Sequence, residues 1–166
     1  MSIQEMEGEK SKGQKLKVFL AGPIHGYEKR QNYRLKIRRL LGDSNISFFD
    51  AWEEEGRRNS FANRNWQTSA YHRAATRLRE KRLAQIDDSD IIIAYISKES
   101  FGTACELSRG NDKGKKIILI CPMKNPSPWI ISITKPELLF KSMKQVEAAI
   151  KNSTLGITLG EESTAT

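Results

Sequence analysis

The sequence predicts a single α/β domain with a doubly wound parallel sheet of about five strands and helices on both faces. Short apolar segments alternate along the chain with longer amphipathic segments, which is the order expected of β-α-β units. The segments 91–96 and 116–121 are apolar on both faces, as the central strands of a parallel sheet must be. With 166 residues, of which 38% are hydrophobic, the chain can bury one ordinary core.

The first part of the chain predicts two strands, one helix and a long loop. A strand is expected over 15–21 and a second over 46–50, with a helix over 28–41 between them. The tight loop Gly22-Pro23-Ile24-His25-Gly26 follows the first strand. Its glycines let the backbone approach a ligand, and free N–H groups could hold a phosphate, although a plain turn explains the same residues. Residues 51–65 show no periodicity and predict an irregular loop on the ligand side of the sheet, anchored by Phe61.

The second part continues the alternation. A long basic helix is predicted over 66–87, followed by the strand 91–96 and a helix over 103–111. The remaining predictions are a strand at 116–121, a loop at 122–128, an apolar segment at 129–133 that suits a subunit interface, a short strand at 138–141 and a helix at 143–151. The polar segments 1–14 and 152–166 predict flexible tails around a domain of residues 15–151.

Composition limits the classes of function. The net charge of +8 favours an anionic ligand such as a nucleotide or nucleic acid, but a solvated lysine-rich surface explains it equally well. No apolar segment approaches the roughly 20 residues that span a membrane. The N-terminus lacks the apolar core of a signal peptide. Cys105 and Cys121 form no metal-binding pattern, so we expect a cytoplasmic protein without metal or cofactor.

Glu106 is the candidate catalytic residue. It is expected in the first turn of the helix that follows the strand 91–96, and α/β folds build their sites just past the C-terminal ends of parallel strands. The carboxylate could act as a nucleophile at a sugar carbon. It could equally do no more than complement the positive end of the helix dipole. From this residue alone, both interpretations stay open.

Three motifs resemble the nucleoside 2-deoxyribosyltransferase superfamily. They are Phe19-Leu-Ala-Gly-Pro-Ile24, the Asp-Ser-Asp90 that precedes an apolar strand, and Ser100-Phe-Gly-Thr-Ala-Cys-Glu106. The resemblance covers roughly residues 16–145 and is strongest to the nucleoside 5′-monophosphate N-glycosidases, which include 2′-deoxynucleoside 5′-phosphate N-hydrolases and CMP hydrolases. It implies a Rossmann-like, flavodoxin-like sheet.

The resemblance also implies a mechanism. The glutamate that matches Glu106 attacks C1′ of the sugar, the base leaves, and a glycosyl-enzyme ester forms. Water then hydrolyses the ester, or a second base accepts the sugar. This is the chemistry of retaining glycosidases, with an oxocarbenium-like transition state.

The resemblance implies a phosphorylated substrate. Ser100 stands where the nucleoside transferases have an aspartate that contacts the sugar 5′-hydroxyl, and a serine there lets a phosphate enter. The implied phosphate-binding residues are Gly22, Ile24, His25, Gly26, Ser100 and Gly102. His25 replaces an arginine of the nucleotide hydrolases and is a weaker phosphate partner unless its imidazole is protonated.

Two further positions follow from the resemblance. Arg82 replaces an aspartate that assists the leaving base, and an arginine cannot act as a general acid near neutral pH. Either another group assists the leaving base, or the substrate differs, or the activity is weak. Arg82 itself could contact the base as a substrate-binding residue, or it could be a solvated arginine. Family members are typically homodimers with shared active sites, for which Ser127 is the first candidate to complete the partner's phosphate site and Ser132 the second.

Three functions remain open from the sequence. The favoured prediction is an N-glycosidase acting on a nucleoside 5′-monophosphate, or a related base-exchanging transferase. The second is a non-catalytic Rossmann-like module that binds a nucleotide or a nucleic acid through its basic helices. Of these two ligands, the nucleic acid is not favoured. The third is an enzyme that cleaves another N-ribosyl bond, such as that of a dinucleotide cofactor.

Overall fold

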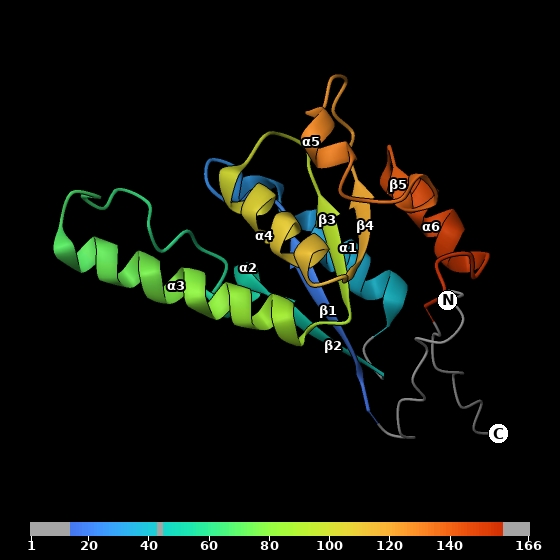
Figure 1. The fold of residues 1–166 in the computed structure, drawn as a ribbon, viewed down its shortest axis with the longest axis horizontal. Coiled ribbons are helices and arrows are strands. Elements are labelled where there is room, and N and C mark those ends of the chain that lie inside the picture. The colour runs from blue at the N-terminus through green and yellow to red at the C-terminus, as the bar shows by residue number, and fades with distance from the viewer. Residues whose placement is uncertain (1–13, 43–44, 158–166) are drawn as a thin grey trace.

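The computed structural model describes residues 14–42 and 45–157, and these form one parallel five-stranded sheet with the strand order β2-β1-β3-β4-β5 (Figure 1). The strands are β1 (Leu16–Ala21), β2 (Ile46–Asp50), β3 (Ile91–Tyr95), β4 (Lys116–Ile120) and β5 (Leu139–Phe140). Every neighbouring pair of strands is parallel. The predicted fold class is therefore confirmed. Of the predicted tails 1–14 and 152–166, residues 1–13 and 158–166 lie outside the described residues.

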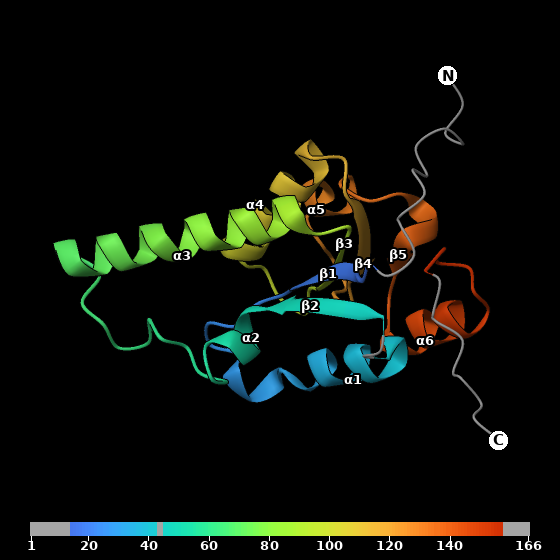
Figure 2. The ribbon, with the colours of Figure 1, turned by 90° about the horizontal axis from the view of Figure 1, so that it is seen from below.

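Helices cover both faces of the sheet. They are α1 (Asn32–Leu41), α2 (Ala51–Glu54), α3 (Ser69–Asp88), α4 (Phe101–Asp112), α5 (Pro128–Ile131) and α6 (Met143–Lys151), with 3₁₀ turns at Glu28–Arg30 and Pro136–Leu138. Figure 2 shows α1 and α6 on one side of the sheet and α3 and α4 on the other. No helix of the described chain combines the length and apolar character needed to cross a membrane.

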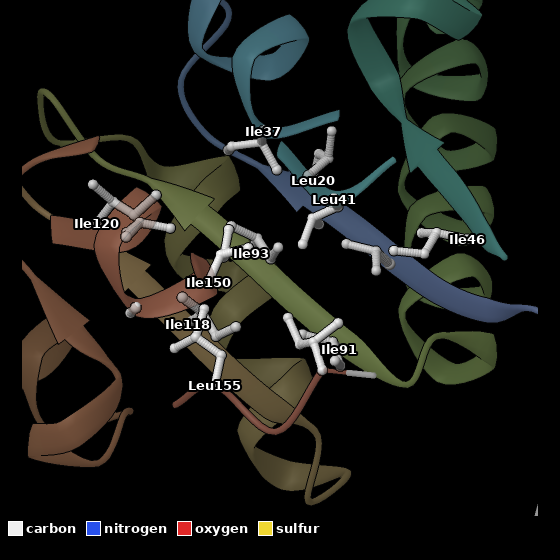
Figure 3. Close-up of a cluster of buried hydrophobic side chains, with 14 of the residues drawn as sticks. Leu20, Ile37, Leu41, Ile46, Ile91, Ile93, Ile118, Ile120, Ile150 and Leu155 are labelled. Atoms are coloured by element: carbon white, nitrogen blue, oxygen red, sulfur yellow. The ribbon is translucent and has the colours of Figure 1, made fainter. Parts of the chain in front are cut away.

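Alternate residues of each strand build two separate cores. The cluster under α1 and α6 takes Val18 and Leu20 of β1 together with Ile91 and Ile93 of β3 (Figure 3). The cluster under α3 and α4 takes the intervening strand residues, and it includes Phe19, Ile92, Ile117, Leu119, Ile86 and Leu107. Because burying one such side chain contributes roughly 1.5–3 kcal/mol, the two clusters fix the strand register and the helix positions.

The strand order reverses between β1 and β3. These two strands pair directly, with Leu20 opposite Ile93 and Ala21 opposite Ala94. The chain leaves β1 toward β2 on one side and leaves β3 toward β4 on the other. The segments that follow β1 and β3 therefore diverge at their C-terminal ends, which is where open α/β sheets bind ligands.

Several predicted element boundaries were wrong. The helix predicted over 28–41 is divided into a 3₁₀ turn and α1. The loop predicted over 51–65 begins with the short helix α2, which starts because Asp50 Oδ1 accepts the N–H of Trp52 at 3.1 Å. The helix predicted from residue 66 begins at Ser69, since Thr68 caps it by accepting the N–H of Tyr71 at 3.1 Å.

The predicted position of Glu106 in its helix was also wrong. Helix α4 begins at Phe101, because Ser100 is the N-cap and its Oγ accepts the N–H of Thr103 at 3.4 Å. Glu106 therefore lies in the second turn of the helix. The field of a helix terminus falls off within the first turn, so complementing the dipole does not account for this carboxylate.

The packed domain extends beyond the predicted boundary at residue 151. Leu155 is 3% exposed and Ile157 is 9% exposed, and both belong to the cluster under α1 and α6. Lys116 Nζ donates a hydrogen bond to the carbonyl of Leu155. At least residues 152–157 are thus part of the fold rather than of a tail.

The N-terminal half of α3 projects past the edge of the sheet (Figures 1 and 2). Its main cover is the preceding loop, where Phe61 packs edge-on against Tyr71 with ring centroids 5.0 Å apart and Arg64 lies over both rings. The predicted anchoring role of Phe61 is confirmed. Trp66, which lies just before the N-terminus of α3, is 71% exposed.

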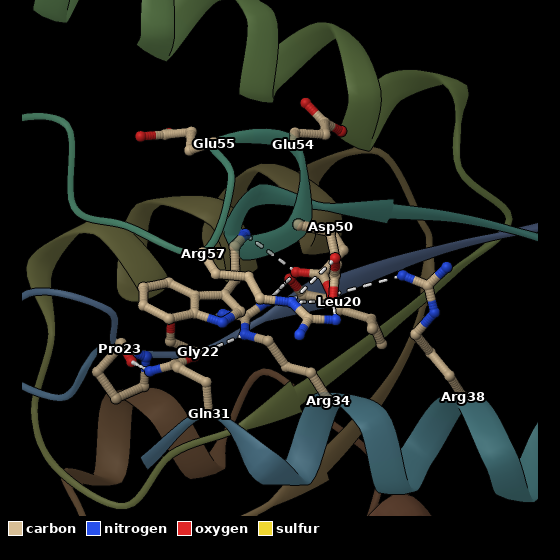
Figure 4. A network of polar contacts seen from close by, with 12 residues as sticks. Leu20, Gly22, Pro23, Gln31, Arg34, Arg38, Asp50, Glu54, Glu55 and Arg57 are labelled. Carbon is tan, nitrogen blue, oxygen red and sulfur yellow. Dashed lines mark hydrogen bonds and ion pairs between the residues drawn. The ribbon is translucent and has the colours of Figure 1, made fainter. Parts of the chain in front are cut away.

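A buried arginine joins the C-terminal ends of β1 and β2 (Figure 4). Arg34 of α1 is 2% exposed; its Nη1 donates to the carbonyl of Leu20 at 3.0 Å and to Asp50 Oδ1 at 2.8 Å. Its Nη2 donates to the carbonyl of Gly22 at 3.2 Å, and its Nε donates to Gln31 Oε1 at 2.7 Å. These bonds satisfy the guanidinium and place α1 against the end of the sheet.

We expect Arg34→Met to lower the free energy of unfolding by about 3–5 kcal/mol, because Asp50 would stay buried without its cation. Urea denaturation measures this change. The double variant Arg34→Met/Asp50→Asn should recover part of the loss, since it removes the uncompensated charge. A loss below about 1 kcal/mol in the single variant would contradict this account of the ion pair.

Candidate active site

The candidate active site lies where β1 and β3 diverge. The segments 22–27 and 96–100 leave the sheet at this point, and α4, which follows the second of them, carries Glu106. A cavity of about 670 Å³ between α3 and α4 has Phe61, Leu78, Arg82, Phe101 and Glu106 in its wall. This volume is in the range of small-molecule sites.

Glu106 is a carboxyl group that is influenced by burial and by two cations. Burial raises its pKa from the ordinary value of 4.5 to about 7, although the guanidinium groups of Arg34 and Arg82 act to lower it. In the described part of the chain, no donor hydrogen-bonds this carboxylate. Both carboxylate oxygens of Glu106 are therefore free of donors from the described residues, as the oxygen of a nucleophile must be.

Arg82 is a buried, ion-paired side chain, so its interpretation as a solvated arginine was wrong. It is 6% exposed; its Nη1 donates to Glu54 Oε2 and Gln85 Oε1, both at 2.8 Å, and its Nη2 donates to Glu55 Oε1 at 3.2 Å. Contact with a substrate base remains a prediction for a side chain already engaged with α2. The sequence analysis missed this pairing because it did not identify α2.

The carboxylates of α2 are acceptors rather than proton donors. Burial alone would raise the pKa of Glu54, but hydrogen bonds from Lys81 and Arg82 hold that pKa below its ordinary value. An ionised Glu54 cannot supply a proton to a leaving base at neutral pH. Its role in this arrangement is to fix Arg82 beside Glu106.

Gly22 leaves room for a buried tyrosine. A Cβ at Gly22 would overlap the Tyr33 hydroxyl and come within 2.8 Å of the Tyr95 carbonyl oxygen. The Tyr33 ring stacks on Tyr95 with centroids 4.5 Å apart. Its buried hydroxyl has no hydrogen-bond partner among the described residues, and burial raises its pKa to about 12. The phenol is therefore protonated at the base of the crevice.

The ring of His25 contacts Asn59. Asn59 Nδ2 lies 2.8 Å from His25 Nδ1. An amide nitrogen only donates, and Asn59 Oδ1 already accepts the N–H of Phe61 at 3.1 Å, so His25 Nδ1 is the acceptor and its proton lies on Nε2.

Lys98 supplies a cation at the same loop and was missed by the sequence analysis. Its Nζ donates to the carbonyl of His25 at 2.9 Å and lies 4.3 Å from the ring centroid of Tyr27. Its position in the segment directly after β3 was the available signal. Gly26, predicted to offer a free N–H, instead donates to Glu28 Oε1 at 3.1 Å.

The remaining predicted residues are divided between two places: Ser100 and Ser127 line a second cavity, whereas Gly102 lines the cavity of Glu106. Ser100 accepts hydrogen bonds from the N–H and the hydroxyl of Thr103, at 3.4 and 3.1 Å. Together with Ser127 it lines a cavity of about 470 Å³, at which Phe101 is 96% and Trp129 83% exposed. Ser132 donates to the carbonyl of Trp129 at 3.0 Å. Ile24 is half-buried, Gly102 is exposed in the first turn of α4, and the described residues include no cluster of metal ligands.

Comparison with known proteins identifies similar sequences and folds. The family model described as nucleoside 2-deoxyribosyltransferase matches residues 18–158. A 2-deoxyribosyltransferase from Bacillus psychrosaccharolyticus is 23% identical, with a TM-score of 0.61, and the match covers 86% of this chain and 98% of that one. The CMP N-glycosidase of Clostridium botulinum is 18% identical, with a TM-score of 0.51, covering 82% and 98%. No curated protein sequence matches the chain.

The raised pKa of Glu106 predicts a stability that depends on pH. Between pH 4.5 and about 7 the folded chain keeps the proton that the unfolded chain loses, so stability falls as pH rises through this window. Glu106→Gln removes the titration. Its stability relative to the wild type should therefore grow by up to about 3 kcal/mol between pH 4.5 and 8, as measured by urea denaturation. A difference that is constant with pH would contradict the assigned pKa.

Proposed function

Because the chain belongs to the nucleoside 2-deoxyribosyltransferase family, we propose that it cleaves the N-glycosidic bond of a nucleoside 5′-monophosphate and releases the free base and a sugar phosphate. The observation that carries this proposal is the Glu106 carboxyl group. It is desolvated, it lies beside two guanidinium groups, and in the described residues it accepts no hydrogen bond.

The reaction proceeds in two displacements at C1′. A carboxylate oxygen of Glu106 forms a bond to C1′ while the C1′–N bond breaks, and its electron pair leaves with the base, which takes a proton from solvent. Water then attacks C1′ of the ester, loses a proton and releases Glu106 as a carboxylate. Arg82 stabilises the carboxylate form but donates no proton.

Several groups favour an anionic substrate. Lys98 and His25 lie together on the segments that follow β3 and β1, and Ser100 carries no charge that would repel a phosphate. The net charge of +8 attracts a nucleotide from solution. A base-exchanging transferase is the second candidate, because the same ester can react with a second base in place of water.

The surface around Ser100 and Ser127 favours a homodimer. Phe101 and Trp129 are almost fully exposed at the rim of an apolar cavity that also contains Met123 and Ile130. Large aromatic side chains in one exposed patch are typical of protein interfaces. We propose that a second copy covers this patch, so that the two active sites lie close to the interface.

We expect release of free base from at least one member of a panel of ribo- and deoxynucleoside 5′-monophosphates. Glu106→Ala should lower this activity by about 10³-fold or more, because the nucleophile is lost. Glu80→Ala is the matched control, since Glu80 is an exposed carboxylate of α3. Chromatography of the products, with and without an added second base, distinguishes hydrolysis from transfer. A panel without any base release would favour the non-catalytic binding module.

Lys98→Met should raise KM for the monophosphate by about tenfold and leave KM for the corresponding nucleoside within about twofold, because the lysine acts on the phosphate alone. Steady-state kinetics at low ionic strength measures both constants. Equal changes for the two substrates would show that Lys98 has a structural role in the loop.

A further inference from the structure

An internal carboxylate occupies the loop that follows β1. The N–H of Gly26 donates to Glu28 Oε1 at 3.1 Å, and Asn59 Nδ2 donates to the same oxygen at 3.2 Å. Gly26 has φ +71, so its N–H is directed by a backbone conformation that favours glycine. Hydrogen bonds from its own backbone N–H and from Asn59 hold the pKa of Glu28 below its ordinary value. Glu28 is therefore an anion at neutral pH.

The groups around this carboxylate are those that bind phosphate. Asn59 reaches across to His25 Nδ1 at 2.8 Å, which leaves the Nε2–H of His25 available as a donor. Lys98 Nζ would lie 3.3 Å from a Cβ at Gly26, so the ammonium is at the loop surface. Among the described residues, no carboxylate forms an ion pair with Lys98. An anion in this loop thus has a backbone N–H, an imidazole N–H and an ammonium within reach.

We propose that Glu28 is a placeholder for the substrate's phosphate and that its charge sets the selectivity between phosphorylated and unphosphorylated substrates. An incoming phosphate takes the N–H of Gly26 and the ammonium of Lys98, and the Glu28 carboxylate moves into solvent. This inference rests on the proposed function, in that the substrate binds with its 5′ end at this loop. It assigns to Glu28 a role that opposes phosphate binding, in contrast to the other groups of the loop.

The rival explanation is that Glu28 only stabilises the loop. Glu28→Gln separates the two, because the amide oxygen of a glutamine still accepts the N–H of Gly26 while the negative charge is gone. If only geometry matters, this variant binds a phosphate as the wild type does. If the charge competes with the ligand, the variant binds it more tightly.

Isothermal titration calorimetry of the full chain with ribose 5-phosphate tests the proposal. We expect Glu28→Gln to bind this ligand about tenfold more tightly than the wild type, since one like charge at contact distance is removed. The gain should shrink in 0.5 M salt because the site is exposed. Glu53→Gln is the matched control: it removes the same charge from α2, where Glu53 pairs with Arg57, and its affinity should stay within about twofold of the wild type.

Titration of the wild type followed by NMR gives an independent readout. Ribose 5-phosphate should shift the backbone amide of Gly26 and the side-chain amide of Asn59, because both lose Glu28 as their acceptor. Equal affinities of wild type and Glu28→Gln, weaker binding by the variant, a silent Gly26 amide, or no binding to either protein would each overturn the proposal.

These outcomes are distinct from failure of the proposed function. Base release from a nucleoside, with no effect of Glu28→Gln on ribose 5-phosphate binding, would overturn the placeholder and leave the chemistry of Glu106 intact. The expected change in affinity for ribose 5-phosphate, without release of base from any substrate, would support the placeholder role of Glu28 and overturn the proposed cleavage by Glu106.

Discussion

The structure depends first on one buried cation. A guanidinium removed from water is tolerated only where acceptors surround it, and Arg34 finds them at the ends of two strands and on its own helix. The interaction that completes the sheet end thus also directs positive potential at Glu106, since Arg34 is one of the two cations that act on its pKa. The stability of the fold and the electrostatics of the site share this side chain, and neither can be altered alone.

The carboxylates near the crevice differ in one respect. Asp50, Glu54, Glu55 and Glu28 each accept hydrogen bonds from a cation, an amide or a backbone N–H. Glu106 accepts none within the described residues, although two guanidinium groups are near enough to influence it. Each of the four acids that hold the loops has at least one donor, although Oδ2 of Asp50 is buried without a hydrogen bond. This contrast, more than the position of Glu106 in a helix, supports the proposal that Glu106 is the nucleophile.

The sequence predicted what depends on local pattern. The isoleucine-rich segments identified β3 and β4 because full burial leaves no polar residue in a central strand, and the spacing from Ser100 to Glu106 identified the residue to examine. It did not predict the pairing of Arg82 with Glu54 and Glu55, since this contact joins elements far apart in the chain and depends on α2. Asp50 followed by Glu53 was a usable start signal for that short helix. The position of Lys98 directly after β3 was a weak signal, because its contact with His25 exists only once β1 and β3 are adjacent.

The overhanging half of α3 has a consequence for how the molecule opens. Residues 69–81 of α3 are exposed or only partly covered, whereas Arg82 and Ile86 are buried. Amide exchange with solvent should therefore be fast along the overhang and slow from Arg82 onward, with the boundary at the ion pairs to α2. Fraying of α3 from its N-terminus would therefore stop at Arg82, before it reaches the part of α3 that faces Glu106 of α4. The turn of α3 that carries Arg82, which lines the cavity together with Glu106, is then the last part of this helix to unfold. The exposed N-terminal turns of α3 can open earlier and admit a ligand.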